Sequence, residues 1–246
     1  MTSLTHSFER RLALTGAYNV RDLGGYATKD GRTTKWGRLF RADGLHKLTE
    51  DDQKALLGKG LRTVIDLRHE QELKQFRNVF SDSNEVAYHN VSLVNPATST
   101  RRDITCLGDL YVDMLDNVQP QLLRVFQLLA AGEGQAALFH CAAGKDRTGV
   151  TAALLLDLAD VPEETIVADY ALTGECIAPI MEELRKGKPE GVPDESYDIF
   201  LASDPSNMVM MLEHLQAKYS GAASYLAAIG LSESELEALR RKLLKD

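Results

Sequence analysis

The sequence predicts an α/β fold in which a central, mostly parallel sheet is flanked by helices. Short apolar segments rich in β-branched residues, such as LRTVIDLR (Leu61–Arg68), have the composition of buried strands. Segments with apolar residues at every third or fourth position, which is typical of amphipathic helices, alternate with these strands along the chain. Because no linker-like stretch interrupts the alternation, residues 1–246 are expected to form a single domain.

The first half of the chain divides into expected strands, helices and one glycine-rich loop. The loop is NVRDLGGY (Asn19–Tyr26), where two consecutive glycines permit unusual backbone angles. A helix is expected to begin after Thr49, which has Asp52 three positions later, and to end near Gly58. A further helix is expected over residues 70–80. The expected strands cover residues 36–41, 61–68 and 86–93.

The second half of the chain is richer in expected helices. Apolar residues spaced three or four apart between residues 107 and 131 predict two helices that meet near Pro120. A short strand over residues 135–139 precedes a loop and a buried helix over 149–158. The last expected helices run from Pro162 to Leu172, over residues 207–219, and from Ser232, where Glu235 completes a capping box. Residues 186–206 hold three of the seven prolines and are therefore predicted to form a flexible loop or lid.

The bulk composition excludes several classes of function. A net charge of −8 at pH 7 does not favour non-specific binding to nucleic acid. The N-terminus has no apolar run of signal-peptide length, and no stretch approaches the length of a transmembrane segment. The three cysteines, Cys106, Cys141 and Cys176, do not suggest a disulfide framework and indicate a reducing compartment. A cytoplasmic location is therefore expected, with export by a route that needs no classical signal left open.

The segment HCAAGKDRTG (His140–Gly149) carries the chemistry. Its strand–loop–helix setting brings backbone N–H groups and a helix N-terminus around one point, where they favour an anion. Gly144 permits the tight curl that such a loop needs. Arg147 lies six residues after Cys141, so closure of the loop lets its guanidinium bind two phosphate oxygens at once. The residues predicted to line the phosphate are Ala142, Ala143, Gly144, Lys145 and Thr148.

Cys141 is predicted to be the nucleophile of a phosphoester hydrolysis. A helix N-terminus and nearby cations favour the thiolate over the thiol, so we expect Cys141 to be ionised at neutral pH. Attack of its sulfur on phosphorus gives a cysteinyl-phosphate, which water then hydrolyses. Thr148 is expected to donate its hydroxyl to the departing sulfur in the second step. His140 is expected to orient the loop by bonding to the backbone.

The same residues carry a resemblance to a known family. HCAAGKDRTG resembles the Cys-x5-Arg-Ser/Thr signature of the cysteine-dependent protein tyrosine phosphatases. More narrowly, it resembles the loop of a bacterial branch that includes secreted mycobacterial and listerial phosphatases. NVRDLGGY, LFRADGLHKLT, VIDLR and DYALT are similar to further blocks of that branch. The resemblance thus extends over scattered blocks from about residue 19 to residue 173 and, more loosely, over the C-terminal helices.

The resemblance implies a tyrosine-phosphatase-like fold with a helical or loop lid. It also implies hydrolysis of phosphotyrosine and, in some members, of phosphoserine, phosphothreonine or phosphoinositides; we expect phosphate and vanadate to inhibit. Phosphoinositide phosphatases with a Cys-Lys-x-Gly-Lys-x-Arg loop carry two lysines for the head group. This loop keeps Lys145 and has Ala142 at the other position, so lipid substrates are expected less than protein substrates. No cofactor is expected, and because the other histidines lack metal-ligand spacing, no metal is expected either.

The leaving oxygen needs a proton donor, and several aspartates are candidates. The resemblance assigns this role to Asp146, although an anion at the start of a helix is also favourable without catalysis. Asp66, at the end of the predicted strand VIDLR, is the second candidate, and it can instead hold Arg147 or Arg68 in place. The remaining candidates lie in the expected lid and are Asp194, Asp198 and Asp204.

Other residues and functions stay open at this point. Arg21 and Asp22 either line the site or form an internal ion pair, and Cys106 and Cys176 are expected to be ordinary thiols rather than redox partners of Cys141. One alternative function is a non-catalytic phosphate-binding module, which needs no thiol. The other is a sulfur-transfer or arsenate-reducing enzyme, which also uses a loop cysteine but typically has a shorter loop or further relay cysteines.

Overall fold

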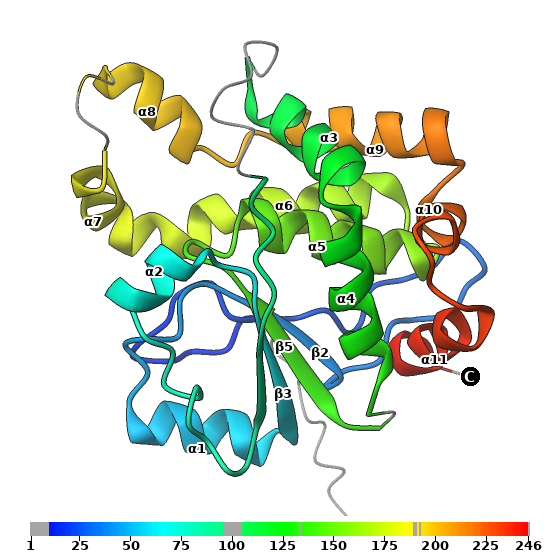
Figure 1. The fold of residues 1–246 in the computed structure, drawn as a ribbon, viewed down its shortest axis with the longest axis horizontal. Coiled ribbons are helices and arrows are strands. Elements are labelled where there is room, and N and C mark those ends of the chain that lie inside the picture. The colour runs from blue at the N-terminus through cyan, green and yellow to red at the C-terminus, as the bar shows by residue number, and fades with distance from the viewer. Residues whose placement is uncertain (1–9, 96–104, 133, 189–190, 192, 246) are drawn as a thin grey trace, which may run out of the picture.

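The computed structural model of the chain describes residues 10–95, 105–132, 134–188, 191 and 193–245. These residues form a five-stranded sheet with helices on both faces (Figure 1). The strand order is β1-β2-β5-β3-β4; β1 is antiparallel to β2, and the other neighbouring pairs are parallel. The predicted α/β fold with a mostly parallel sheet is therefore confirmed. The strands are β1 (Arg21–Asp22), β2 (Leu39–Ala42), β3 (Leu61–Asp66), β4 (Ala87–Asn90) and β5 (Ala136–His140).

Helices make up most of the remaining described chain. On one face of the sheet α1 contacts β3, and on the other α5 contacts β2 and β5, with α6 packed behind it; α3 packs against α9 (Figure 1). A short 3₁₀ helix, η2 (Ala178–Ile180), joins α6 to α7. The helices are α1 (Glu50–Gly58), α2 (Glu70–Gln75), α3 (Leu107–Asn117), α4 (Gln119–Ala130), α5 (Asp146–Leu158), α6 (Glu163–Ile177), α7 (Met181–Lys186), α8 (Asp194–Leu201), α9 (Pro205–Tyr219), α10 (Ala222–Ala228) and α11 (Glu233–Leu243).

Alternate side chains of the strands enter two separate cores. In β5, Phe139 belongs to a large core shared with α3, α4, α5 and α11, whereas Leu138 belongs to a smaller core shared with α1. Ile65 and Val64 divide in the same way in β3. Because successive residues of a strand point to opposite faces, apolar runs such as AALF bury both faces of the sheet. Burial on both faces fixes the strand ends, and the candidate site lies at one of these ends.

Several predicted elements are confirmed down to their capping residues. Thr49 and Asp52 form a reciprocal capping box at the start of α1, in which the Asp52 N–H donates to the Thr49 hydroxyl at 3.1 Å. Ser232 and Glu235 form the same box at the start of α11. The two helices predicted to meet near Pro120 are α3 and α4, and Pro120 lies in the first turn of α4, where its missing N–H costs no hydrogen bond.

The helix predicted over residues 70–80 is too long. α2 ends at Gln75, because Phe76 leaves the helical region with φ −132° and ψ 77°. Beyond it, the Asn78 side chain accepts a hydrogen bond from the Phe80 N–H at 2.9 Å, which makes a turn in place of a further helical turn. Asparagine favours such turns because its side chain competes with the backbone for hydrogen bonds.

Smaller boundary errors have similar local causes. β2, β3 and β4 are shorter than predicted, and β3 ends where the Asp66 carboxylate accepts from the Arg68 N–H at 3.1 Å in a local turn. Pro162 caps α6 from outside, and this helix continues beyond Leu172 to Ile177. The glycine-rich loop also contains the two-residue strand β1, and the seven-residue helix α10 has no counterpart among the predictions.

The segment predicted as a flexible loop or lid over residues 186–206 contains a helix. α8 begins after Pro193 and carries Asp194 and Glu195 in its first turn, where acidic residues interact favourably with the helix dipole. Figure 1 shows α7 and α8 together at one corner of the molecule. Residues 189–190 and 192 of this segment lie outside the described residues, and movement of a lid stays a prediction.

Candidate active site

The loop HCAAGKDRTG lies at the carboxyl end of the central strand. β5 runs between β2 and β3, and α5 begins at Asp146, so residues 141–145 link a buried strand to a helix N-terminus. Ligands of open α/β sheets bind at this end of the strands. Cys141 is 2% exposed and lines a cavity of about 310 Å³. The other predicted site residues that line this cavity are Ala142, Ala143, Lys145, Asp146 and Arg147.

Every carbonyl from residue 141 to residue 144 accepts a hydrogen bond from a donor outside this segment. By contrast, the amides of residues 142–147 have no acceptor within the described part of the chain outside helix α5. Because the carbonyls are held from outside, the amides are left to face the interior of the loop, which is the arrangement that binds anions. The donors are His140 Nδ1 to Cys141 (3.0 Å), the Gly44 N–H to Ala142 (2.8 Å), Asn19 Nδ2 to Ala143 (2.9 Å) and the Arg41 guanidinium to Gly144 (2.7 Å).

Gly144 is the turning point of this loop. Its φ is +67°, in the left-handed region, and a Cβ added to it would lie 2.6 Å from the carbonyl oxygen of Ala42. Ala42 cannot easily withdraw, because it belongs to β2 and pairs with His140 of β5. Only glycine fits this position without a shift of the sheet, so the curl that the sequence predicted has a steric basis.

Arg147 already has an anionic partner. Its two terminal amino groups donate to the two carboxylate oxygens of Glu72 in α2, at 2.6 and 3.0 Å. Burial alone would lower the pKa of Arg147, but the charges of Cys141 and Glu72 raise it above its ordinary value and keep the group cationic. A guanidinium has five N–H donors, so Nε–H and one N–H of each amino group remain for a phosphate.

Glu72 was not identified from the sequence. The only local signal is its place in a capping box with His69, whose N–H donates to the Glu72 carboxylate at 2.9 Å. Histidine is an uncommon N-cap residue, so the pattern does not draw attention. The contact between Glu72 and Arg147 joins residues 75 positions apart and depends on how α2 packs beside the loop.

Asp146 is held at one oxygen. Its Oδ1 accepts a hydrogen bond from the Tyr111 hydroxyl of α3 at 2.5 Å, and the Lys145 ammonium lies 3.5 Å from the same oxygen. Its side chain is 19% exposed and lines the cavity, and within the described ranges Oδ2 has no hydrogen-bond partner. One oxygen is therefore anchored while the other is available to a group in the cavity. Tyr111 was also not identified from the sequence.

Lys145 is turned toward α8. Its ammonium donates to the carbonyl of Phe200 and, at 3.1 Å, to that of Ala202, and it lies 5.3 Å from the centroid of the Phe200 ring. The side chain is buried. Carbonyls at the end of a helix attract cations, so this contact joins the catalytic loop to the carboxyl end of α8. In this arrangement Lys145, which was predicted to contact phosphate, has protein carbonyls as partners.

The Thr148 hydroxyl is buried and has no hydrogen-bond partner in the described structure. An unsatisfied buried hydroxyl costs free energy, so the Thr148 hydroxyl is open to a partner that enters the loop. Its predicted role as a donor to the sulfur of Cys141 stays a prediction.

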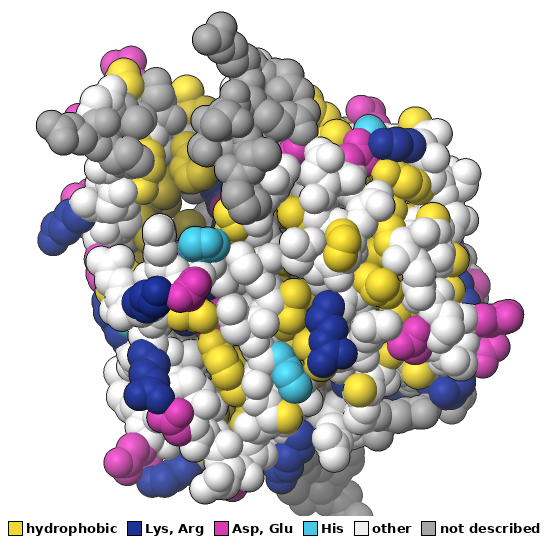
Figure 2. Space-filling view, in the orientation of Figure 1, with side chains coloured by type: hydrophobic (Ala, Val, Ile, Leu, Met, Phe, Trp, Pro, Cys, Tyr) yellow, Lys and Arg dark blue, Asp and Glu magenta, His cyan; other side chains and the backbone are white. Residues whose placement is uncertain are grey.

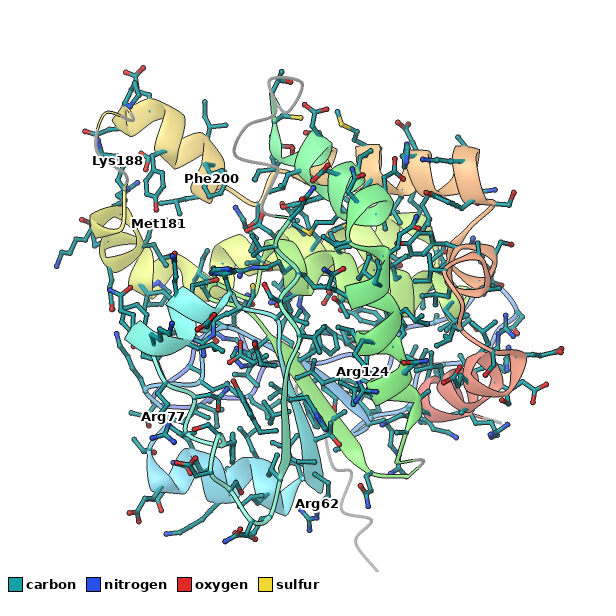
Figure 3. All side chains as sticks on the ribbon, in the orientation of Figure 1. Arg62, Arg77, Arg124, Met181, Lys188 and Phe200 are labelled. Carbon is teal, nitrogen blue, oxygen red and sulfur yellow. The ribbon has the colours of Figure 1, made fainter. Side chains whose placement is uncertain are left out.

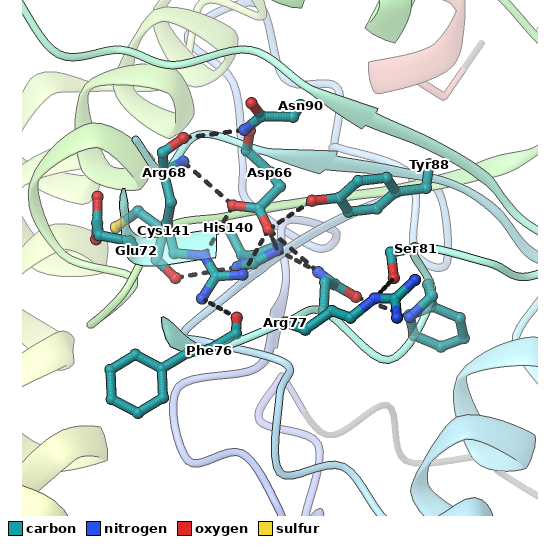
Figure 4. A network of polar contacts seen from close by, with 12 residues as sticks. Asp66, Arg68, Glu72, Phe76, Arg77, Ser81, Tyr88, Asn90, His140 and Cys141 are labelled. Atoms are coloured by element: carbon teal, nitrogen blue, oxygen red, sulfur yellow. Dashed lines mark hydrogen bonds and ion pairs between the residues drawn. The ribbon is translucent and has the colours of Figure 1, made fainter. Parts of the chain in front are cut away.

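His140 and Asp66 form a buried network beneath the loop (Figure 4). The Asp66 carboxylate binds Arg68 at 2.7 Å, the Tyr88 hydroxyl at 3.0 Å and His140 Nε2 at 3.2 Å. Burial would raise the pKa of Asp66, but the charges and hydrogen bonds of His140 and Arg68 hold it well below its ordinary range. Asp66 is fully buried and does not line the cavity. Of its two predicted roles, the geometry supports the one in which it fixes its neighbours rather than donating a proton.

A second buried cluster of charges lies beside the loop. Arg21 and Arg41 are paired in register across β1 and β2, and both form ion pairs with Asp169 of α6. Burial would raise the pKa of Asp169, but the two guanidinium groups lower it to about 2. Arg41 also holds the carbonyl of Gly144. Two cations and one anion therefore leave a positive charge next to the anion-binding loop of a protein whose net charge is −8.

The remaining candidate acids have structural partners away from the cavity. Asp194 pairs with a lysine at 3.0 Å, and Asp198 pairs with an arginine at 2.8 Å. Asp204 caps α9 by accepting from a backbone N–H at 2.9 Å. Asp22, which was predicted to line the site or to pair with Arg21, instead accepts from the N–H groups of Gly24 and Gly37 and forms no ion pair with Arg21. None of these four aspartates lines the cavity.

The wall of the cavity is mostly apolar and aromatic, with Asn95 and Asp113 as its polar residues outside the loop. Tyr197 and Phe200 of α8 stack with their ring centroids 6.1 Å apart, and Figure 3 shows Phe200 on α8 at the corner where Met181 and Lys188 mark α7 and its exit. In the space-filling view, hydrophobic side chains gather on the side of α8 that faces the body of the molecule (Figure 2). Apolar residues from four other segments also line the cavity: Leu93, Val94, Leu110, Met114, Ile177 and Leu184.

Comparison with known proteins identifies the family of the chain. A model of the tyrosine phosphatase family matches residues 12–245, which is nearly the whole chain. The chain belongs to the tyrosine phosphatase family. The family predicted from HCAAGKDRTG and the neighbouring blocks is thereby confirmed, and so is the prediction of a protein-tyrosine phosphatase. Membership favours this activity over a phosphate-binding module and over sulfur transfer or arsenate reduction.

Two relatives of this tyrosine phosphatase cover most of the chain. A tyrosine-protein phosphatase of Nostoc commune is 32% identical over 224 residues, which are 83% of this chain and 74% of that protein. The triple specificity protein phosphatase PtpB of Mycobacterium tuberculosis is 26% identical over 276 residues, which are 94% of this chain and 98% of that protein. Among solved structures, TpbA of P. aeruginosa matches 72% of this chain and 86% of its own, with 16% identity and a TM-score of 0.37.

None of the helices in the described ranges is long and apolar enough to cross a lipid bilayer.

Proposed function

We propose that this tyrosine phosphatase hydrolyses protein phosphotyrosine through a cysteinyl-phosphate, with Cys141 as nucleophile, Arg147 as phosphate clamp and Asp146 as proton donor. The observation that carries the proposal is the loop itself, in which every carbonyl from residue 141 to 144 is held from outside beside a buried thiol. Such a loop binds a phosphate dianion and places its phosphorus next to the sulfur.

The first step transfers the phosphoryl group to the enzyme. The Cys141 thiolate attacks phosphorus, the bond between phosphorus and the tyrosine oxygen breaks, and Asp146 gives its proton to the departing oxygen. Arg147 and the loop amides bind the equatorial phosphate oxygens, where charge is spread in the transition state.

The second step returns the enzyme to its starting state. A water molecule attacks the phosphorus of the cysteinyl-phosphate, Asp146 takes up a proton from this water, and the bond between sulfur and phosphorus breaks. The unpartnered Thr148 hydroxyl is suited to donate a hydrogen bond to the thiolate that leaves. Inorganic phosphate is the product, so phosphate is expected to inhibit by rebinding, and vanadate by mimicking the transition state.

The shape of the cavity supports an aryl phosphate as the substrate. Aromatic and aliphatic side chains, including Tyr197 and Phe200, line the space in front of the loop, and such walls bind a phenyl ring well. The name of the Nostoc relative supports phosphotyrosine, and the name of PtpB supports a wider specificity for that protein. Lys145 is engaged by α8, which weighs against its use for a second phosphate of a phosphoinositide.

The decisive experiment compares Cys141→Ser with the unchanged protein. The variant is expected to lose turnover of p-nitrophenyl phosphate and of a phosphotyrosine peptide while it still binds phosphate in calorimetry. In the unchanged protein, acid quenching during turnover should trap phosphate on the peptide that contains Cys141. Inhibition by vanadate and indifference to a metal chelator are expected as well. Turnover that survives in Cys141→Ser would refute the proposed nucleophile.

We also propose that the chain forms a single phosphatase domain and works in a reducing compartment. The family match extends over residues 12–245, which supports one phosphatase domain with its catalytic loop at 140–149. Cys106, Cys141 and Cys176 are all free, and Cys176 is buried against Arg21 with its sulfur 3.7 Å from the guanidinium. Free thiols and a thiol nucleophile suit the cytoplasm, where disulfides are rare.

A further inference from the structure

The proposed proton donor is tied to a pair of buried tyrosines. Tyr111 of α3 donates its hydroxyl to Asp146 Oδ1 at 2.5 Å, and the Tyr111 oxygen lies 2.7 Å from the hydroxyl of Tyr170 in α6. The two rings meet edge to face with centroids 5.8 Å apart, and both are almost fully buried. The pair therefore connects α3 and α6 to one carboxylate oxygen.

The partners of Asp146 gather on one of its oxygens. Oδ1 receives the Tyr111 hydroxyl and faces the Lys145 ammonium at 3.5 Å, while Oδ2 has no partner within the described ranges. A proton on Oδ1 would meet a donor and a cation, so a protonated Asp146 carries its proton on Oδ2. A carboxyl that transfers its proton to a leaving group must present that proton toward the cavity, and Asp146 lines the cavity.

We propose that Tyr111 is the positioning residue of the proton donor, because its hydrogen bond to Oδ1 fixes the rotation of the Asp146 carboxyl and directs the transferable proton to Oδ2. This inference rests on the proposed function, in which Asp146 is the acid. Burial and the charge of Asp146 raise the pKa of Tyr111, so its hydroxyl keeps its proton and remains a donor at working pH. The Tyr170 hydroxyl is one hydrogen bond further from Asp146, and it orients the hydroxyl of Tyr111.

The test compares Tyr111→Phe with the matched control Tyr170→Phe. Each variant loses one buried hydroxyl and keeps its ring, but only Tyr111→Phe removes the donor to Asp146. For a phosphotyrosine peptide, whose leaving group needs a proton, kcat is expected to fall ~10-fold in Tyr111→Phe and less than about threefold in Tyr170→Phe. For p-nitrophenyl phosphate, whose leaving group needs little protonation, both variants are expected to stay within about twofold.

A comparison of kcat with KM and a double variant separate positioning from a structural effect. In Tyr111→Phe the loss should fall on kcat for the phosphotyrosine peptide, while KM and the inhibition constant of inorganic phosphate stay within about twofold, because Tyr111 touches only the carboxyl that serves the leaving group. Adding Tyr111→Phe to Asp146→Asn should change kcat for the peptide by less than about twofold, since Tyr111 acts through Asp146. Equal losses on both substrates, or a full further loss in the double variant, would overturn the role of Tyr111.

The same data distinguish this inference from the function on which it rests. If Asp146→Asn slows the peptide and p-nitrophenyl phosphate equally, Asp146 is not the acid, and the proposed mechanism fails at that point. If Asp146→Asn slows the peptide selectively and Tyr111→Phe does not, the acid is correct and only the positioning role is refuted.

Discussion

At the residue scale, Asp146 and Arg147 are neighbours in the chain that have partners on different elements. Asp146 is held by Tyr111 of α3, and Arg147 is held by Glu72 of α2. Among the residues that the structure describes, each partner leaves part of its group unbonded: Asp146 Oδ2 in one case, and three N–H donors of Arg147 in the other. Such fixed side chains lose little conformational entropy when the substrate binds, which favours catalysis.

Removal of the proton donor should depend on the substrate. In Asp146→Asn, kcat for a phosphotyrosine peptide is expected to fall ~100-fold, within the usual contribution of a general acid, whereas p-nitrophenyl phosphate should lose less than about threefold. Steady-state kinetics on both substrates provide the measurement. Asp194→Asn and Asp198→Asn serve as controls from the other candidate acids and should leave both rates unchanged; a selective loss in either would move the assignment to α8.

Glu72 can be tested with a neighbour on the same short helix. In Glu72→Gln the negative charge is lost and only one oxygen remains to accept from Arg147, so the guanidinium is held less firmly. We therefore expect kcat/KM to fall ~10-fold, which corresponds to ~1.4 kcal/mol of transition-state stabilisation. Glu70→Gln is the control, because Glu70 is exposed and pairs with Lys74 rather than Arg147. The inhibition constant of inorganic phosphate should rise in Glu72→Gln only. Similar behaviour of the two variants would contradict a positioning role for Glu72.

The sequence predicts the reactive residues better than it predicts their partners. Cys141 and Arg147 stand in one continuous segment, so their spacing and the adjacent helix start are visible in the sequence. Glu72, Tyr111 and Arg41 lie between 35 and 103 positions away from the loop residues that they contact. Nothing local marks them, because their role arises only when α2, α3 and β2 are packed around the loop.

At the scale of elements, α8 forms one wall of the cavity and is tied to the loop through Lys145. The ammonium binds carbonyls at the carboxyl end of α8, and the aromatic residues of the same helix face the cavity. A loop residue thereby sets the position of a helix that begins nearly 50 positions later in the chain. The sequence predicted a loop or lid here because of its prolines, but Pro193 is the N-cap residue of α8, a position where proline does not interrupt the helix.

Replacement of Lys145 should loosen this wall. In Lys145→Met, amide hydrogen exchange of residues 194–201 is expected to accelerate, and KM for a phosphotyrosine peptide should rise ~5- to 10-fold as the helix loses two hydrogen bonds to a cation. Exchange measured by mass spectrometry and peptide kinetics provide the readouts.

The control for this prediction is Lys186→Met in α7, whose side chain is exposed. It should leave both exchange and KM unchanged. If Lys145→Met instead weakened inhibition by inorganic phosphate and left the exchange of α8 as it was, Lys145 would contact the phosphate, as the sequence suggested, rather than the helix.

On the scale of the whole molecule, two buried carboxylates make the stability of the fold depend on pH. Asp66 and Asp169 both have folded-state pKa values below the ordinary value of 3.8, and that of Asp169 is about 2. A carboxyl with a lower pKa in the folded state binds fewer protons there than in the unfolded chain, so stability rises with pH in this range. The contribution is present above about pH 4 and is lost as the pH falls toward 2.

The free energy of unfolding should therefore fall steeply between pH 4 and pH 2. Urea unfolding followed by circular dichroism over this range is the measurement. Asp169→Asn should show a flatter dependence and a lower stability at neutral pH, because Arg21 and Arg41 then lack their buried counter-charge. A wild-type stability that did not change between pH 4 and pH 2 would contradict the role assigned to these carboxylates.

The phosphate-binding loop and the aromatic residues of α8 belong to different segments of the chain, and this has a consequence for the evolution of such an enzyme. In the proposed mechanism, bond cleavage depends on the ten residues HCAAGKDRTG and the side chains that hold them. The surroundings of the phosphotyrosine ring depend largely on Tyr197 and Phe200 of α8. New preferences among phosphorylated targets are therefore accessible through substitutions in α8 that spare the reaction itself, so that selectivity and reactivity are free to evolve apart.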